Sequence, residues 1–195
     1  YFNLGPEGGE FADFNDLMVE SDGFQEQEVH SDDGFVIIHT AAVAGRPRGA
    51  LLSHANVLWA NMHFMYQVGL GPGDALLNIL PLFHVGGLFS ATATFHAGGL
   101  TANVKKFDAA QATKLIQDKR LTFMVEFPPI LTSILDEHEK NGVDISSLRA
   151  VGGLDSPETI ERYQRLTGGH FYCLYGQTET SCLATFSRYD DKPGS

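Results

Sequence analysis

The sequence has few cysteines, no long apolar run and no Lys or Arg in its first 35 residues. Two cysteines, Cys173 and Cys182, are too few for a disulfide framework and favour a reducing compartment, here taken as the cytoplasm. No stretch approaches the roughly 18 consecutive apolar residues that a membrane-spanning helix needs. The start, Tyr1 to Gly5, lacks an initiator Met and the basic, then apolar, pattern of a secretory signal, so we interpret the chain as a piece of a longer protein.

The acidic residues are concentrated at the N-terminal end. Ten of the 24 acids lie in the first 35 positions, whereas the other 160 residues hold 14 acids and all 13 bases of a chain whose net charge is -11. Because such a segment repels nucleic acid and anionic lipid, no nucleic-acid partner is expected. The composition predicts a solvated acidic leader over residues 1–34; an acidic docking face is the alternative, and no residue pattern supports it.

From Phe35 onward, short apolar runs alternate with helical patterns. We expect strands at 35–40, 75–80, 100–104, 121–127, 148–151 and 170–175, and helices at 53–68, 87–97 and 108–119, from Pro128, and after Ser156. This alternation predicts an α/β domain over residues 35–195 with a largely parallel sheet and flanking helices. Ligands of such folds bind at the carboxyl ends of strands, which here are followed by the loops after Thr40, Leu80, Val151 and Tyr175.

The loop from Thr40 to Gly49 is built mainly of small residues and contains Arg48. Backbone N–H groups of such a loop can surround phosphate oxygens while a cation balances their charge. Its spacing does not match GxxxxGK[ST], which excludes a standard P-loop NTPase. An ordinary turn is the simpler interpretation of this loop taken alone.

His84 lies in an apolar stretch directly after the strand expected at 75–80. A lone histidine in such company is often only a core side chain. Its position at a strand end, next to two glycines that allow a ligand to approach, also suits a binding or catalytic role.

The segment from Tyr175 to Thr180 closes the last expected strand. Tyr175 offers a flat face for a heteroaromatic ring, Thr178 a hydroxyl for an oxyanion, and Glu179 a hard oxygen ligand for Mg²⁺. The simpler interpretation is a strand followed by a short helix that Thr178 caps.

Taken together, in this order and spacing, the three motifs resemble those of the AMP-forming acyl-adenylate ligases, the family of acyl-CoA synthetases, luciferases and peptide-synthetase adenylation domains. Thr40 to Gly49 aligns without a gap with that family's loop T-S-G-T-T-G-x-P-K-G. Further segments that look like the family are Asp32-Asp33, Leu52-Ser53-His54-x-Asn56, Phe127-Pro128-Pro129, Val151-Gly152-Gly153 and, cut off midway, Lys192 to Ser195.

The resemblance implies part of the large N-terminal domain of an enzyme that joins a small carboxylic acid to coenzyme A, using ATP, with AMP and pyrophosphate as products, and Mg²⁺. By position, the implied catalytic residues are Thr178, Glu179 and His84, and Glu179 is the implied metal ligand. Phosphate-binding residues would be Thr40, Gly45, Arg48 and Gly49; adenine-binding residues Gly152, Gly153, Tyr175 and Gly176; acyl-pocket residues His84, Val85, Gly86, Val125 and Phe127.

Two departures from the family pattern keep an alternative open. The loop has lost three hydroxyls and one glycine, and Arg48 stands where the family has lysine, so a non-catalytic nucleotide- or acyl-binding relative is the second hypothesis. The family's later ribose-binding aspartate and its C-terminal domain with a catalytic lysine would lie beyond Ser195, so residues 1–195 alone are expected to be inactive. The pattern does not indicate which carboxylic acid is used or the oligomeric state.

Overall fold

The computed structural model describes residues 2–3, 12–13, 16, 23, 25–41, 45–188 and 191. The chain divides into two units, residues 1–30 and residues 31–195, and each is described by itself. In the first, β1 (Phe2–Asn3) pairs in parallel with β2 (Ala12–Asp13). Most of the expected acidic leader, the loop residues 42–44 and the closing motif at 192–195 lie outside the described residues.

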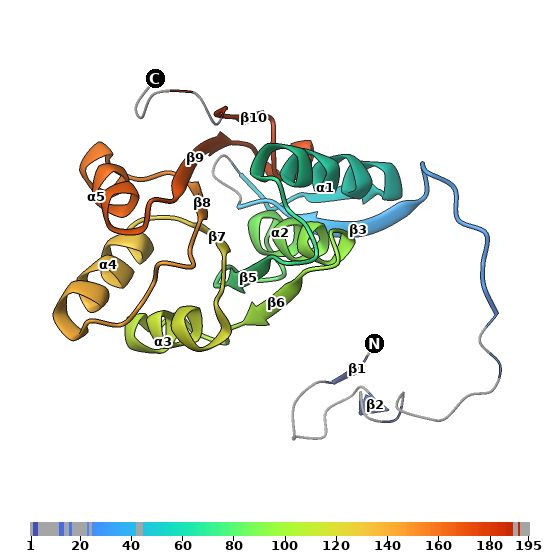
Figure 1. Cartoon of the computed structure of the whole chain (residues 1–195). Coiled ribbons are helices and arrows are strands. Elements are labelled where there is room, and N and C mark those ends of the chain that lie inside the picture. The colour runs from blue at the N-terminus through green and yellow to red at the C-terminus, as the bar shows by residue number, and fades with distance from the viewer. Residues whose placement is uncertain are drawn as a thin grey trace. The chain divides into compact units, whose positions relative to one another are not determined.

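The second unit contains a six-stranded sheet in the order β10-β9-β8-β7-β5-β6 (Figure 1). Its strands are β5 (Ala75–Asn78), β6 (Leu100–Asn103), β7 (Phe123–Glu126), β8 (Ala150–Gly153), β9 (His170–Tyr175) and β10 (Thr185–Phe186). All neighbouring pairs are parallel except β9 and β10. The predicted α/β class with a largely parallel sheet is therefore confirmed.

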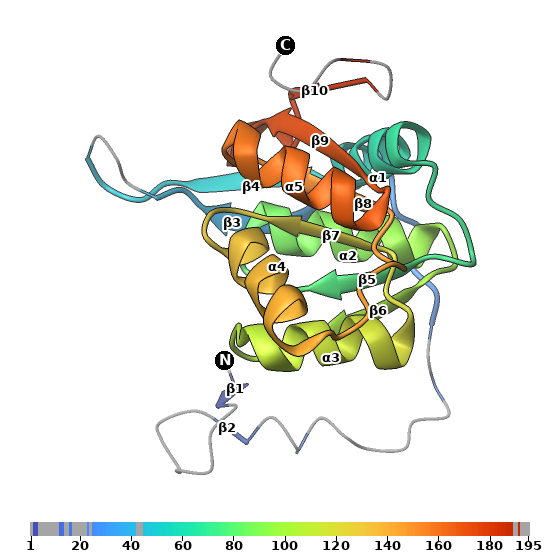
Figure 2. The same ribbon diagram turned by 60° about the vertical axis from the view of Figure 1, so that its left-hand side comes forward.

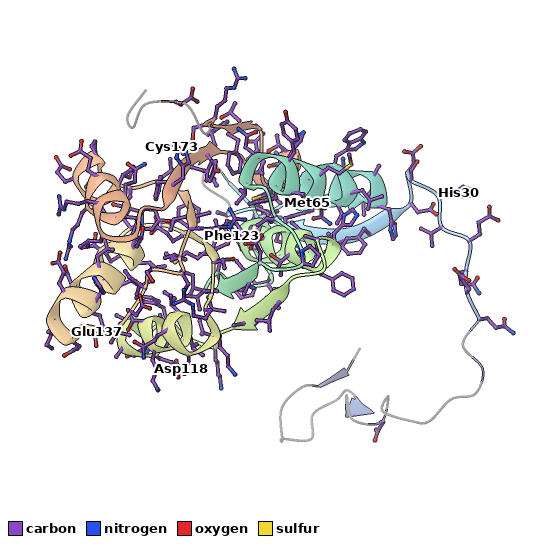
Figure 3. The ribbon with its side chains drawn as sticks, in the orientation of Figure 1. His30, Met65, Asp118, Phe123, Glu137 and Cys173 are labelled. Atoms are coloured by element: carbon purple, nitrogen blue, oxygen red, sulfur yellow. The ribbon has the colours of Figure 1, made fainter. Side chains whose placement is uncertain are left out.

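Five helices cover the two faces of this sheet (Figure 2). One face packs against α1 (His54–Val68) and α2 (Val85–His96), and the other against α3 (Ala109–Lys119), α4 (Ile130–Asn141) and α5 (Pro157–Thr167). Side chains alternate between the faces along each strand, so Phe123 of β7 joins the first core and Met124 joins the second. Phe123 lies inside the domain in Figure 3, and none of its surface is exposed.

Three helices begin at the side-chain caps that the sequence predicts. Ser53 accepts a hydrogen bond from the N–H of Asn56, Asp108 accepts one from Gln111, and Ser156 precedes Pro157 at the first helical position. Such caps satisfy N–H groups that the first turn leaves without an intrahelical partner. None of the helices in the described ranges combines the length and apolarity needed to cross a bilayer.

The strand expected at 35–40 is confirmed, but its expected place in the parallel sheet is wrong. It forms β3 (Gly34–His39), which pairs with the unpredicted β4 (Gly49–Ser53) as an antiparallel hairpin separate from the parallel sheet. Ile37 and Leu51, which are paired in register, are 61% and 65% exposed, so only the other face of the hairpin is buried. A continuous apolar run does not reveal whether one face or both are covered.

The strand order places a crevice at the carboxyl end of the sheet. The chain runs from β5 outward to β6 through α2, and then returns through α3 to β7 on the other side of β5. The chain leaves the carboxyl end of β5 into α2 and that of β7 into α4, and these two helices cover opposite faces of the sheet. The connections therefore diverge between β5 and β7, which is where open α/β sheets bind ligands.

Candidate active site

A pocket with a volume of about 310 Å³ lies at this carboxyl end. Five segments meet in it: the base of the β3–β4 loop, the N-terminus of α2, the end of β7, the end of β8, and the turn after β9. Ten of the residues that the sequence pointed to line the pocket: Thr40, His84, Val85, Gly86, Val125, Phe127, Tyr175, Gly176, Thr178 and Glu179.

The turn after β9 depends on Gly176. A Cβ atom at this position would overlap the carbonyl oxygen of Cys182, so only glycine fits where the chain folds back on itself. The carbonyl oxygen of Tyr175 accepts a hydrogen bond of 2.9 Å from the N–H of Ala184 across the same turn. The Tyr175 side chain remains 64% exposed at the rim of the pocket, which leaves its ring face free for a planar ligand.

A single 3₁₀ turn, η2 (Thr178–Thr180), follows and presents the two polar candidates. Its cap is Gln177, so the simpler interpretation of Thr178 as the cap is wrong. Thr178 is half-buried and Glu179 is exposed, and both line the pocket. Glu179 has no hydrogen-bonding or ionic partner among the described residues, so its carboxylate is free to bind a cation.

His84 is the cap of α2, because this helix begins at Val85, two residues earlier than predicted. The Nδ1 atom of His84 accepts a hydrogen bond of 3.1 Å from the N–H of Gly86. We infer from this bond that the neutral ring carries its proton on Nε2, which can then donate to an oxygen in the pocket. Gly87 is needed in the first turn of α2, since a Cβ atom there would overlap the carbonyl oxygen of Pro81 in the preceding loop.

The expected phosphate loop contributes less to the pocket than its alignment implied. Thr40 and Arg48 hold the base of the loop together: the Thr40 N–H donates to the Arg48 carbonyl (2.9 Å), and the Arg48 N–H donates to Thr40 Oγ1 (3.2 Å). Thr40 lines the pocket, whereas Gly45, Arg48 and Gly49 do not. The Arg48 side chain is exposed and projects from a hairpin rather than from the end of a sheet strand.

The glycine pair Gly152-Gly153 lies behind the pocket wall instead of lining it. A Cβ atom on Gly152 would lie 3.3 Å from Leu174 Cδ2, and one on Gly153 would overlap the carbonyl oxygen of Glu126. These glycines therefore allow β8 to lie close against its neighbours.

Sequence reasoning missed five lining residues: Ala41, Leu154, Leu174, Gln177 and Cys182. Leu154 directly follows β8, so the strand-end rule could have included it. The sequence does not indicate that Cys182 lines the pocket, because its position there depends on how the chain folds back at Gly176. Burial raises the pKa of its thiol to about 12, so it acts as a packed apolar side chain and not as a nucleophile.

Comparisons with known proteins show what the chain is similar to. A family model described as "AMP-binding enzyme" matches residues 6–195. The indoleacetate–CoA ligase of Aromatoleum aromaticum is 31% identical over 159 residues, which are 80% of this chain and 31% of that protein.

Two solved structures from Rhodopseudomonas palustris are also similar. A protein provisionally named a long-chain-fatty-acid CoA ligase has a TM-score of 0.88 and 45% identity, over 98% of this chain and 48% of that one. ATP-bound MatB has a TM-score of 0.77 and 26% identity, over 89% of this chain and 35% of that one. The chain thus spans between about a third and a half of the length of these relatives.

Proposed function

Because the chain belongs to the family of AMP-binding enzymes, we propose that it forms the nucleotide and acyl site of an AMP-forming acid–CoA ligase. In this reaction a carboxylate oxygen attacks the α-phosphate of ATP and displaces pyrophosphate. The thiolate of coenzyme A then attacks the acyl carbon and displaces AMP. The observation that carries the proposal is the single pocket in which Thr40, His84 and the Tyr175–Glu179 turn meet.

The polar lining suits the first of these two steps. The Tyr175 ring would stack on adenine, with Gly176 beside it and the Gly152-Gly153 backbone behind the wall. The Thr178 hydroxyl would donate to the α-phosphate, and the Nε2–H of His84 would orient the attacking carboxylate. Val85, Gly86, Val125 and Phe127 supply the apolar surface that an acyl chain or aromatic ring requires.

The pyrophosphate side would be bound by the β3–β4 loop. Thr40 is already at the pocket, and Gly45, Arg48 and Gly49 would approach the β- and γ-phosphates from outside its wall. A charge-assisted hydrogen bond contributes about 1.5–3 kcal/mol, so a loop with fewer donors than its relatives should hold pyrophosphate more weakly.

Mg²⁺ fits the donors that are present. Glu179 is the only carboxylate that lines the pocket in the described part of the chain, and those residues contain no cluster of three potential metal ligands. Mg²⁺ is commonly held by one or two carboxylates together with substrate phosphates and water, so one free carboxylate is sufficient. When bound, Mg²⁺ would neutralise charge on the phosphate oxygens.

A second candidate is a nucleotide- or acyl-binding protein without ligase activity. We propose the cytoplasm as the compartment for both candidates. The position of Arg48 favours the second candidate, because Arg48 does not line the pocket where the phosphates would have to be held. This candidate predicts AMP binding with no pyrophosphate release.

Glu179→Gln tests the proposal, with Glu161→Gln as the matched control because Glu161 is exposed on α5 outside the pocket. In the full-length protein, we expect Glu179→Gln to reduce Mg²⁺-dependent pyrophosphate release by at least about a hundredfold, as losing a single charge-stabilising group often does. Circular dichroism should show that both variants are folded. Equal turnover of the two variants would refute the metal role of Glu179.

A further inference from the structure

Glu126, the last residue of β7, is a carboxyl group with no exposed surface. Its Oε2 atom accepts a hydrogen bond of 3.3 Å from the N–H of Leu131 in the first turn of α4, where the cap residue Pro129 offers no side-chain bond. Its Oε1 atom is buried and has no hydrogen-bonding partner in the described part of the chain. An oxygen left in this state destabilises the fold unless it gains a partner.

Asp155, in the turn between β8 and α5, is in the same situation. Its Oδ1 atom accepts a hydrogen bond of 2.7 Å from the N–H of Ser156, while its Oδ2 atom is buried and unpaired among the described residues. Each carboxyl group therefore has one oxygen at the start of a helix and one without a donor. Since both unpaired oxygens are acceptors, a proton bound by one of them would supply the missing donor.

The electrostatics favour a proton on Glu126. Burial, and secondarily the negative charge of Asp155, raise the pKa of Glu126 to about 8, against the opposing effect of the Leu131 N–H. Asp155 is the titratable group that acts on Glu126 from the β8–α5 turn, and from α4 the contact is the uncharged N–H of Leu131. Glu126 is therefore mainly neutral at pH 7.

This carboxyl pair lies directly behind the pocket wall. Glu126 pairs in register with Gly153, and a Cβ atom on Gly153 would lie 3.1 Å from Glu126 Oε1. Glu126 is followed by Phe127, and Gly153 is followed by Leu154; both of these following residues line the pocket. A change in spacing between the ends of β7 and β8 would therefore move two wall residues.

We propose that Glu126 is a positioning residue for the pocket: in its neutral form it links the end of β7 to the Gly153–Asp155 turn, and so fixes Phe127 and Leu154 in the wall of the pocket that the nucleotide and the acyl group share. This inference rests on the proposed function for the identity of the ligand. Ionisation of Glu126 places a second negative charge beside Asp155 in a buried site, and their repulsion separates the two strand ends.

The test is AMP binding measured by calorimetry between pH 7 and pH 9. If only the neutral form binds well, a pKa of about 8 leaves about one tenth of the protein competent at pH 9, so the affinity falls about tenfold across this range. Glu126→Gln cannot ionise and still offers a donor, so we expect its affinity to stay constant with pH. Glu161→Gln should show the same decline as the wild type. Equal pH profiles for the wild type and Glu126→Gln would overturn the inference.

Infrared spectroscopy provides a measurement that needs no ligand. The wild type at pH 7 should show the carbonyl stretch of a buried protonated carboxyl group, which disappears as the pH rises through 8 and is missing from Glu126→Gln. Absence of this band in the wild type at pH 7 would overturn the inference whatever the nucleotide does. If the band is present but AMP binds at no pH, the proposed nucleotide site fails, and with it the positioning role, while the neutral carboxyl pair stands.

Discussion

Replacing Arg149 by methionine should destabilise the sheet domain far more than the same change at a surface arginine. Arg149 precedes β8 and binds Asp74 through two hydrogen bonds, Nε to Oδ1 (2.9 Å) and Nη2 to Oδ2 (2.8 Å). It also donates to the carbonyl oxygens of Val68 (2.8 Å) and Gly69 (3.0 Å) at the end of α1. One guanidinium thus joins α1, β5 and β8 at the end of the sheet opposite the pocket.

The magnitude follows from the exposure of this pair. The Asp74 side chain is only 11% exposed and that of Arg149 is 40% exposed. Breaking a fully buried ion pair costs about 3–5 kcal/mol, whereas an exposed pair contributes about 0–1 kcal/mol. Because the guanidinium is partly solvated, we expect Arg149→Met to lower the free energy of unfolding by about 2–3 kcal/mol.

Urea unfolding followed by circular dichroism provides the assay, and Arg120→Met is the control. Arg120 forms one bond of 3.0 Å to Asp144, with both side chains well exposed, so its loss should cost less than about 1 kcal/mol. If the two variants lose the same stability, the argument from burial is refuted. Although burial alone raises the pKa of Asp74, the hydrogen bonds from Arg149, Thr122 and Gly71 lower it on balance. The contribution of this pair is therefore fully present above the ordinary value of 3.8 and is lost as the pH falls through the lowered pKa.

Two further predictions concern Glu126 and Gly176. Because folding raises the pKa of Glu126 from 4.5 to about 8, its contribution to stability is fully present below 4.5 and is lost as the pH rises to 8. Relative to Glu126→Gln, the wild type should lose about 3.5 kcal/mol of unfolding free energy between pH 5 and pH 8, since the full slope of about 1.4 kcal/mol per pH unit applies only between the two pKa values. Urea unfolding that shows the same pH dependence of stability for both proteins would contradict this. Gly176→Ala should cost about 1–3 kcal/mol, because its methyl group overlaps the Cys182 carbonyl oxygen, and it should weaken AMP binding. Gly73→Ala, which meets nothing within 4 Å, is the control, and equal losses at the two glycines would refute the steric argument.

Much of the fold could be predicted because its signals are local. The caps at Ser53, Asp108 and Ser156 lie at the helix starts that the sequence indicates, and apolar runs such as 121–127 contain strands. The hairpin of β3 and β4 could not be predicted in this way, because an apolar run carries no information about its partner strand.

The residues of the candidate site likewise include some that a local rule selects and some that only the tertiary structure reveals. The strand-end rule points to His84, Phe127 and Tyr175, since residues that follow neighbouring parallel strands must meet at one edge of the sheet. It gives no reason to select Glu126, which reads as one polar residue in an apolar strand. The role proposed for Glu126 depends on its burial and on the charge of Asp155, which raise the pKa of Glu126. The two residues come close only because β7 pairs with β8.

Pyrophosphate release by the intact protein tests the central claim most directly. The assay contains ATP, Mg²⁺ and a panel of aliphatic and aromatic carboxylic acids, and it is run in parallel with calorimetry of AMP binding. We predict release that depends on the presence of one class of acid, which would also identify the substrate. AMP binding without release for any acid would contradict the ligase assignment and favour the nucleotide-binding candidate.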